Sequence, residues 1–102
     1  MRFNEEFVEK ILTGRKSASV RSNVRGMKTG TVKPLTSRGR RFAMAKIVEV
    51  RPIRFSQLGE EDAKRDGFDN LQQLVEGLKQ FYKKLKPDSR LYVVRFEVVE
   101  RF

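Results

Sequence analysis

The segment from Phe42 to Phe55 constrains the fold more than any other part of this chain. Its first half carries apolar residues at both sets of alternating positions, namely Phe42, Ala43, Met44, Ala45 and Ile47. Because alternate side chains of a strand point to opposite faces, the pattern predicts a long central strand that is buried on both faces. Pro52 predicts a bulge or the end of regular pairing. A strand of this kind fits a small closed barrel with a helical lid.

The second half of the chain contains the clearest helix and a final strand. Apolar residues recur there at steps of three and four, which predicts a core-facing helical stripe. The stripe consists of Leu71, Leu74, Val75, Leu78, Phe81, Tyr82 and Leu85. Asp69 and Gln72 have the spacing of a capping box at its start, and Pro87 predicts its end. The segment from Leu91 to Glu100, rich in Val, Tyr and Phe, predicts a strand.

Shorter elements complete the order. Asn4 predicts the start of a short helix that ends at Gly14, and an acidic helix is expected over residues 57–66, closed by Gly67. Residues 17–21 and 31–35 predict two short strands, the second at a sheet edge because it contains Pro34. The order predicts an α+β fold: a small mixed β-barrel with helices packed at one side. With 102 residues, we expect a single domain over the whole chain.

The composition excludes several kinds of chemistry. The sequence has no cysteine and no histidine, which rules out disulfides, thiolate nucleophiles, the usual zinc sites and histidine bases. Acidic residues show no spacing typical of a metal site, so we expect no cofactor and no metal ion. No apolar run is long enough to span a bilayer, and no signal-peptide pattern begins the chain. We therefore expect a cytoplasmic protein without a membrane partner.

The net charge of +10 is unevenly distributed. Residues 1–54 contain 14 Lys or Arg and 4 Asp or Glu, whereas residues 55–102 contain nine of each kind. No carboxylate occurs from Lys10 to Val48. Such a segment predicts a surface that faces a polyanion, with RNA or a nucleotide as the leading partner. The alternative interpretation is that the charge serves solubility.

The stretch from Gly14 to Arg21 is the best candidate for a site. Its alternation places Ala18 and Val20 on one face of a strand, and Ser19 with Arg21 on the other. If the small apolar pair faces a core, the hydroxyl and the guanidinium line an open face. The alternative is an ordinary polar strand surface.

Further cations extend this candidate site. Lys16 lies at the expected helix–strand junction, from which its long stem reaches the same face as Arg21. Arg38, Arg40 and Arg41 are expected in an exposed loop, where guanidinium groups bind phosphates in a fork geometry. We therefore predict binding roles for these five residues. Solvated surface charges are the alternative.

These residues, in this order, resemble the ASCH domain family of the PUA-like group. The matching positions are Gly14, Lys16, Ser19 and Arg21, then Lys28 to Gly30, Ala45 to Val50, Leu58 to Ala63, Asp66 to Phe68, and Leu91 to Glu97. The resemblance extends over nearly the whole chain. It implies a PUA-like barrel with a cleft between barrel and helices, and a role in RNA-related processes.

Small bacterial enzymes of that family hydrolyse the amide of N4-acetylcytidine, and the resemblance implies site residues here. Lys16 matches their lysine. Ser19 stands at their threonine and keeps the hydroxyl, and Asp66 stands at their glutamate with a shorter stem. In such a site Lys16 would act as the base for the Ser19 hydroxyl, with Asp66 orienting it and Arg21 holding the carbonyl oxygen. A structural ion pair between Lys16 and Asp66 is the alternative.

Three functions therefore remain open. The first is a module that binds RNA or a modified nucleotide in the cleft, and the second is an amidohydrolase acting on N4-acetylcytidine or a related nucleoside. The third is a non-catalytic component of an RNA-processing or translation assembly, with a protein partner. No aromatic residue lies between Phe7 and Phe42, so the basic half lacks a platform for stacking bases. Recognition of RNA shape and backbone fits it better.

Overall fold

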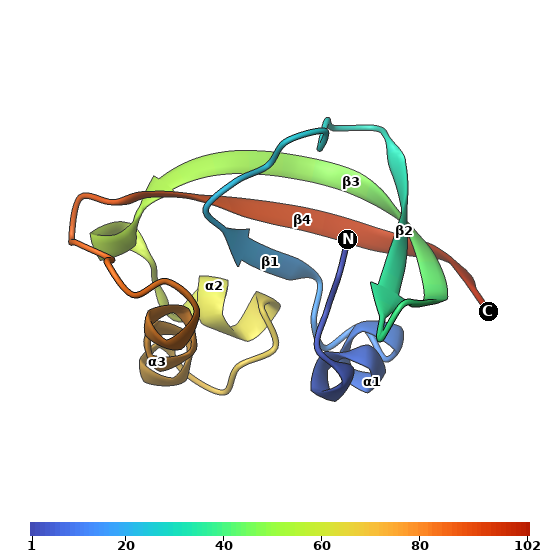
Figure 1. Ribbon diagram of the computed structural model, residues 1–102, viewed down its shortest axis with the longest axis horizontal. Helices are drawn as coiled ribbons and strands as arrows, with labels where there is room; N and C mark the ends of the chain where they lie inside the picture. The colour runs from blue at the N-terminus through green and yellow to red at the C-terminus, as the bar shows by residue number, and fades with distance from the viewer.

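Two long strands, β3 (Arg40–Arg54) and β4 (Arg90–Arg101), form the centre of the sheet in the computed structural model, which describes residues 1–102. The shorter strands β1 (Ala18–Arg21) and β2 (Val32–Ser37) flank them in the order β1-β4-β3-β2, and all neighbours are antiparallel. The sheet is strongly curved, and the helices lie on one side of it (Figure 1). The predicted α+β class, with helices at one side, is confirmed.

The N-terminal segment lies between the two outer strands. Phe3 N–H donates to Thr36 O of β2 (2.9 Å), Thr36 N–H donates to Met1 O (2.8 Å), and an isolated parallel bridge joins Arg2 to Thr36. On the other side, Arg21 Nη2 of β1 donates to Arg2 O (3.3 Å). The parallel part of the predicted mixed barrel is therefore limited to this bridge, which connects β2 to β1 through the chain's first residues.

Burial on both faces occurs on β4, not on β3. Neighbouring Val93 and Val94 are both buried and belong to two different core clusters, so both faces of β4 are covered there. On β3, Ala43, Ala45 and Ile47 on one face are buried, but Lys46 and Val48 on the other face are exposed. The prediction of a strand buried on both faces over residues 42–55 is therefore wrong in this respect, because one face of the antiparallel sheet borders water.

The helices are short, and the structure corrects the ends of the longest one. Their bounds are η1 (Glu5–Phe7), α1 (Val8–Leu12), η2 (Phe55–Gln57), α2 (Glu60–Arg65) and α3 (Leu71–Phe81). Asn70, not Asp69, caps α3, since its side chain accepts the Gln73 N–H (3.0 Å). The helix ends at Phe81, six residues before Pro87, and Phe81 is exposed instead of lying in the predicted core stripe.

The predicted basic loop between β2 and β3 is a tight turn. Only Arg38 and Gly39 lie between the strands, with φ of +53° and +76°, as in a two-residue hairpin. Arg40 and Arg41 therefore belong to β3. The predicted loop over residues 36–41 is limited to Arg38 and Gly39, but the three arginines are exposed as expected. Pro34 lies on the outer strand β2, as predicted. None of the helices has both the length and the apolar character that a membrane-spanning helix needs.

Candidate active site

Lys16 is buried at the junction between the first helix and β1. Gly14, with φ +81°, turns the chain after α1, and Lys16 N–H then donates to Lys10 O (2.9 Å). The ammonium group is surrounded by three acceptors: Ala18 O (3.0 Å), Asp66 O (2.8 Å) and Asp66 Oδ1. Only 2% of the Lys16 side chain is exposed. The alternative interpretation of Lys16 as a solvated charge is therefore wrong.

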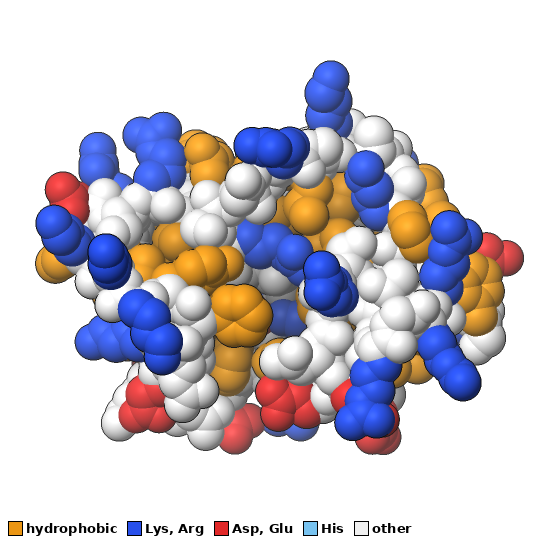
Figure 2. Space-filling view, in the orientation of Figure 1, with side chains coloured by type: hydrophobic (Ala, Val, Ile, Leu, Met, Phe, Trp, Pro, Cys, Tyr) orange, Lys and Arg blue, Asp and Glu red, His pale blue; other side chains and the backbone are white.

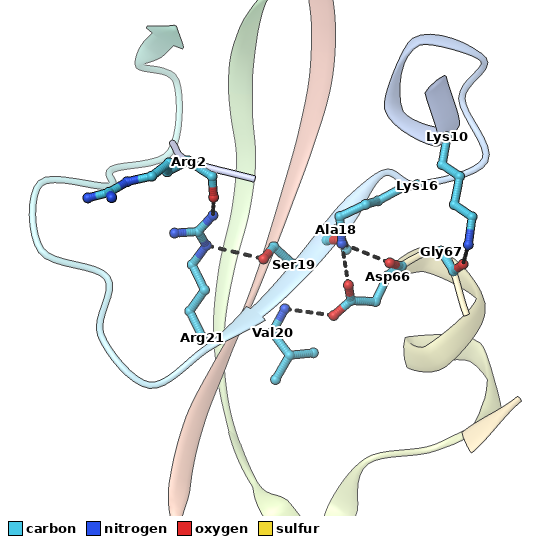
Figure 3. Close-up of polar contacts among 9 residues, drawn as sticks. All are labelled: Arg2, Lys10, Lys16, Ala18, Ser19, Val20, Arg21, Asp66 and Gly67. Carbon is cyan, nitrogen blue, oxygen red and sulfur yellow. Dashed lines mark hydrogen bonds and ion pairs between the residues drawn. The ribbon is translucent and has the colours of Figure 1, made fainter. Parts of the chain in front are cut away.

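Asp66 reaches β1 from the end of α2. Its Oδ1 accepts a hydrogen bond from Lys16 Nζ, and its Oδ2 accepts the Val20 N–H (3.0 Å). Gly67, with φ +91°, turns the chain directly after it, and Lys10 Nζ donates to Gly67 O (2.8 Å). Figure 3 shows these contacts, which join residues 46 to 57 positions apart in the sequence.

The proton shared by Lys16 and Asp66 can reside on either side chain. An ammonium group donates to all three acceptors. A neutral amine donates to the carbonyls of Ala18 and Asp66, and accepts from a protonated Asp66 Oδ1. Burial is the main cause of both shifts: it lowers the pKa of Lys16 and raises the pKa of Asp66, while their mutual attraction opposes each shift. A proton can thus move between Lys16 Nζ and Asp66 Oδ1 without the loss of any other hydrogen bond.

Two aromatic rings cover the basic groups of the site. Lys16 Nζ lies 4.7 Å from the ring centroid of Phe7 and 5.6 Å from that of Phe3. The Arg21 guanidinium lies 5.2 Å from the centroid of Phe3. Both rings belong to the segment before β1, and no local sequence signal predicts their contact with Lys16 and Arg21. The rings exclude water, which strengthens electrostatic interactions beneath them.

Ser19 and Arg21 lie on the same face of β1, as the alternation predicted. Ser19 is buried, however, so the expectation that its hydroxyl lines an open face is wrong. Arg21 Nε donates to Ser19 Oγ (3.1 Å), and burial lowers the pKa of the half-buried Arg21. No hydrogen bond joins Ser19 to Lys16 or Asp66. The peptide groups on either side of Ser19 are nevertheless held by that pair, through Ala18 O and Val20 N. Lys and Arg side chains lie at the bottom of a hollow over β1 (Figure 2).

The hairpin arginines do not join this cluster. Arg38 forms an exposed ion pair with Glu5 (3.0 Å), and neither Arg40 nor Arg41 has a hydrogen bond or ion pair with the site residues. Their role in binding therefore stays a prediction, separate from the geometry around Lys16. No three carboxylates gather closely enough to hold a metal ion.

The sequence profile of the ASCH domain matches residues 1–100. The chain belongs to the ASCH domain family. This confirms the resemblance that the sequence showed. An N(4)-acetylcytidine amidohydrolase from Vibrio atlanticus (strain LGP32) is 34% identical to this ASCH domain over 102 residues, which cover 97% of this chain and 94% of the relative.

Solved structures of low identity share the fold. The ASCH domain from Lactobacillus crispatus JV V101 superposes with a TM-score of 0.82 at 21% identity, over 91% of this chain and 70% of that one. A protein from Enterococcus faecalis V583 gives 0.81 at 21% identity, over 91% and 66%. At these identities the likeness establishes that the fold is that of ASCH domains.

Proposed function

We propose that this ASCH domain is an amidohydrolase that removes the acyl group from N4 of an acylated cytidine, with N4-acetylcytidine as the first substrate to test. The buried Lys16–Asp66 pair carries the proposal, because it can exchange a proton next to a strand hydroxyl. Buried ion pairs add little stability on balance, whereas perturbed pKa values cluster at functional sites. A relative that is 34% identical and bears this activity in its name also supports the proposal.

Each polar group of the site has a role in the proposed reaction. Ser19 Oγ attacks the acyl carbon, and its proton passes to Lys16, whose own extra proton has moved to Asp66. The carbonyl oxygen becomes negative beside the Arg21 guanidinium, which stabilises it. The C–N bond then breaks, and the amino group of cytidine leaves with a proton from the Lys16–Asp66 pair. Water hydrolyses the Ser19 ester, which releases the acid and restores the hydroxyl.

The contact between Ser19 and Lys16 forms in the substrate complex. In the free protein Ser19 Oγ is bonded to Arg21 Nε, and the catalytic hydrogen bonds of free enzymes are often long until substrate binds. When the guanidinium turns to the acyl oxygen, the hydroxyl is released to face the Lys16 amine. Arg21 therefore couples substrate binding to activation of Ser19.

The test is turnover by the purified protein. Incubation with N4-acetylcytidine should release cytidine and acetate, and Lys16→Ala and Ser19→Ala should each abolish the release. Arg25→Ala, which removes an exposed cation from the loop after β1, should retain full activity. Turnover that survives both site substitutions would show that the assignment is wrong.

RNA binding is the second candidate, favoured by the segment from Lys10 to Val48 that contains no carboxylate. When binding depends on phosphate contacts, the logarithm of the binding constant falls linearly with the logarithm of the salt concentration. The slope is about −0.7 per contact for a single strand. A titration of a labelled RNA between 50 and 300 mM salt, roughly, measures that slope. A flat response would exclude this electrostatic binding.

A further inference from the structure

A groove outside the Lys16–Asp66 pair begins where β1 ends. It has a volume of about 580 Å³, in the usual range for ligand sites. The end of α3, the segment after it and the start of β4 form its walls. Residues that line it include Ser22, Phe81, Tyr82, Lys83, Lys84 and Arg90.

The groove is joined to the candidate active site through Tyr82. Its hydroxyl accepts the Ser22 N–H (3.3 Å), and Ser22 directly follows Arg21 in the chain. Arg21 in turn donates to Ser19 Oγ. The groove therefore begins at Ser22, three residues after Ser19 in the chain.

An exposed aromatic ring lies at the edge of the groove. Phe81 is 73% exposed, and its ring is tilted by 56° against that of Tyr82, with centroids 5.7 Å apart. Every nucleobase has a flat face that stacks on such a ring. The chain thus has the stacking platform that its basic first half lacks, and the fold brings it to the end of β1.

The charges of the groove have a single sign. Lys83, Lys84 and Arg90 line it, no carboxylate does, and none of the three side chains forms an ion pair or a hydrogen bond. Lys and Arg side chains predominate over the segment between α3 and β4 (Figure 2). Unpaired cations beside an exposed ring suit a chain of phosphates and bases, and they suit an apolar peptide poorly.

We propose that the groove binds the nucleotide next to the one over Ser19, so that the substrate is a single-stranded polynucleotide and not only a free nucleoside. The neighbouring base stacks on Phe81, and its phosphate lies at Lys83, Lys84 and Arg90. This proposal rests on the proposed function, because that function places the reacting nucleoside over Ser19. The groove itself makes a separate prediction about binding.

Fluorescence anisotropy with labelled single-stranded decamers, one of RNA and one of DNA, tests the groove. Phe81→Ala should weaken binding of the decamers by about tenfold, a typical loss for one stacked base. Phe102→Ala, which removes another exposed phenylalanine, is the matched control and should have no effect. An equal loss with RNA and DNA assigns the contact to base and phosphate, and a loss with RNA alone assigns it to a ribose-dependent pose. Unchanged binding of both decamers to Phe81→Ala would overturn the proposal.

The lysines give a second, independent measurement. Lys83→Ala/Lys84→Ala should reduce the slope of affinity against salt by about 1.4, the value for two phosphate contacts. Lys64→Ala/Lys79→Ala removes the same charge from exposed positions outside the groove and should leave the slope unchanged. Equal slopes for the two double variants would overturn the phosphate contacts.

Failure of the groove and failure of the proposed function are distinguishable. If N4-acetylcytidine is hydrolysed while decamers bind no better to the wild type than to Phe81→Ala, the groove proposal fails and the activity stands. If decamers bind in a manner that depends on Phe81 while no acylated cytidine is hydrolysed, the groove stands and the activity fails.

Discussion

Lys16 Nζ and Asp66 Oδ1 are hydrogen-bonded to each other, and each residue also binds one of the two peptide groups that flank Ser19. The pair therefore fixes the backbone on both sides of the hydroxyl. Any change in the pair's charge or geometry is transmitted directly to Ser19. This arrangement makes the stability of the fold and the proposed chemistry depend on the same two side chains.

The pH dependence of stability reports which form of the pair is present. The pKa of Asp66 is raised above 3.8, so above about pH 4 the folded protein retains a proton that the unfolded chain has lost. The contribution of Asp66 to the free energy of unfolding is therefore complete below that pH and decreases as the pH rises. The pKa of Lys16 is lowered below 10.5, so on approach to that pH the unfolded chain binds the extra proton and stability rises.

The contribution of Lys16 and Asp66 to the free energy of unfolding should therefore pass through a minimum between these limits. Urea denaturation from pH 3 to 11 measures it, and Lys16→Met/Asp66→Asn provides the baseline that contains all other titrating groups. We expect the difference between wild type and this variant to be U-shaped. A difference that peaks near neutral pH would contradict the predicted shifts and indicate a fully ionised pair.

The backbone of Gly67 packs directly against Lys16 of the candidate active site. Its φ is +91°, and an added Cβ would lie 3.2 Å from Lys16 Cβ. Gly67→Ala should cost about 1 kcal/mol through its left-handed conformation, and crowding against Lys16 should add to that cost and reduce turnover. Gly14→Ala is the matched control, because Gly14 has φ +81° but nothing within 4 Å of the added atom. Equal losses of stability in the two variants, measured by urea denaturation, would exclude the crowding.

Sequence patterns predicted the site where the pattern is local. Alternation over four residues placed Ser19 and Arg21 together, and a glycine after each short helix predicted the turns at Gly14 and Gly67. The pairing of Lys16 with Asp66 came only from the family resemblance. Residues 50 positions apart have no local periodicity that connects them, and their contact depends on how α2 packs against β1.

Tertiary contacts account for what the patterns missed. The stripe on α3 continues to Leu85 in the sequence, but Tyr82 is extended and its hydroxyl contacts Ser22, so the helix ends at Phe81. The contact with Ser22, the residue that follows β1, here overrides the helical preference of Lys83 to Lys86, because propensity is weak compared with tertiary context. Because α3 ends at Phe81, this side chain is exposed, although the periodicity assigned it to the core.

Removal of Lys16 alone should be more harmful than removal of the pair. Lys16→Met leaves Asp66 buried without its partner, which typically costs about 3–5 kcal/mol. In Lys16→Met/Asp66→Asn, an uncharged amide replaces the carboxylate, still accepts the Val20 N–H, and can donate to the carbonyls that Lys16 released. We expect the double variant to be more stable than Lys16→Met in urea denaturation. The opposite order would show that the carboxylate is stabilised without Lys16.

Arg21 provides the most specific test of the proposed chemistry. Its guanidinium donates to Ser19 Oγ and to Arg2 O, and it is the half-buried cation beside the hydroxyl. Arg21→Lys keeps the charge but loses the fork geometry. Loss of one donor to a developing oxyanion reduces kcat by about 10²–10³. Steady-state kinetics with N4-acetylcytidine should show that loss in kcat with a smaller change in KM, while Arg25→Lys retains the wild-type kcat. If the substitution raises KM and leaves kcat unchanged, Arg21 binds the substrate and does not stabilise the transition state.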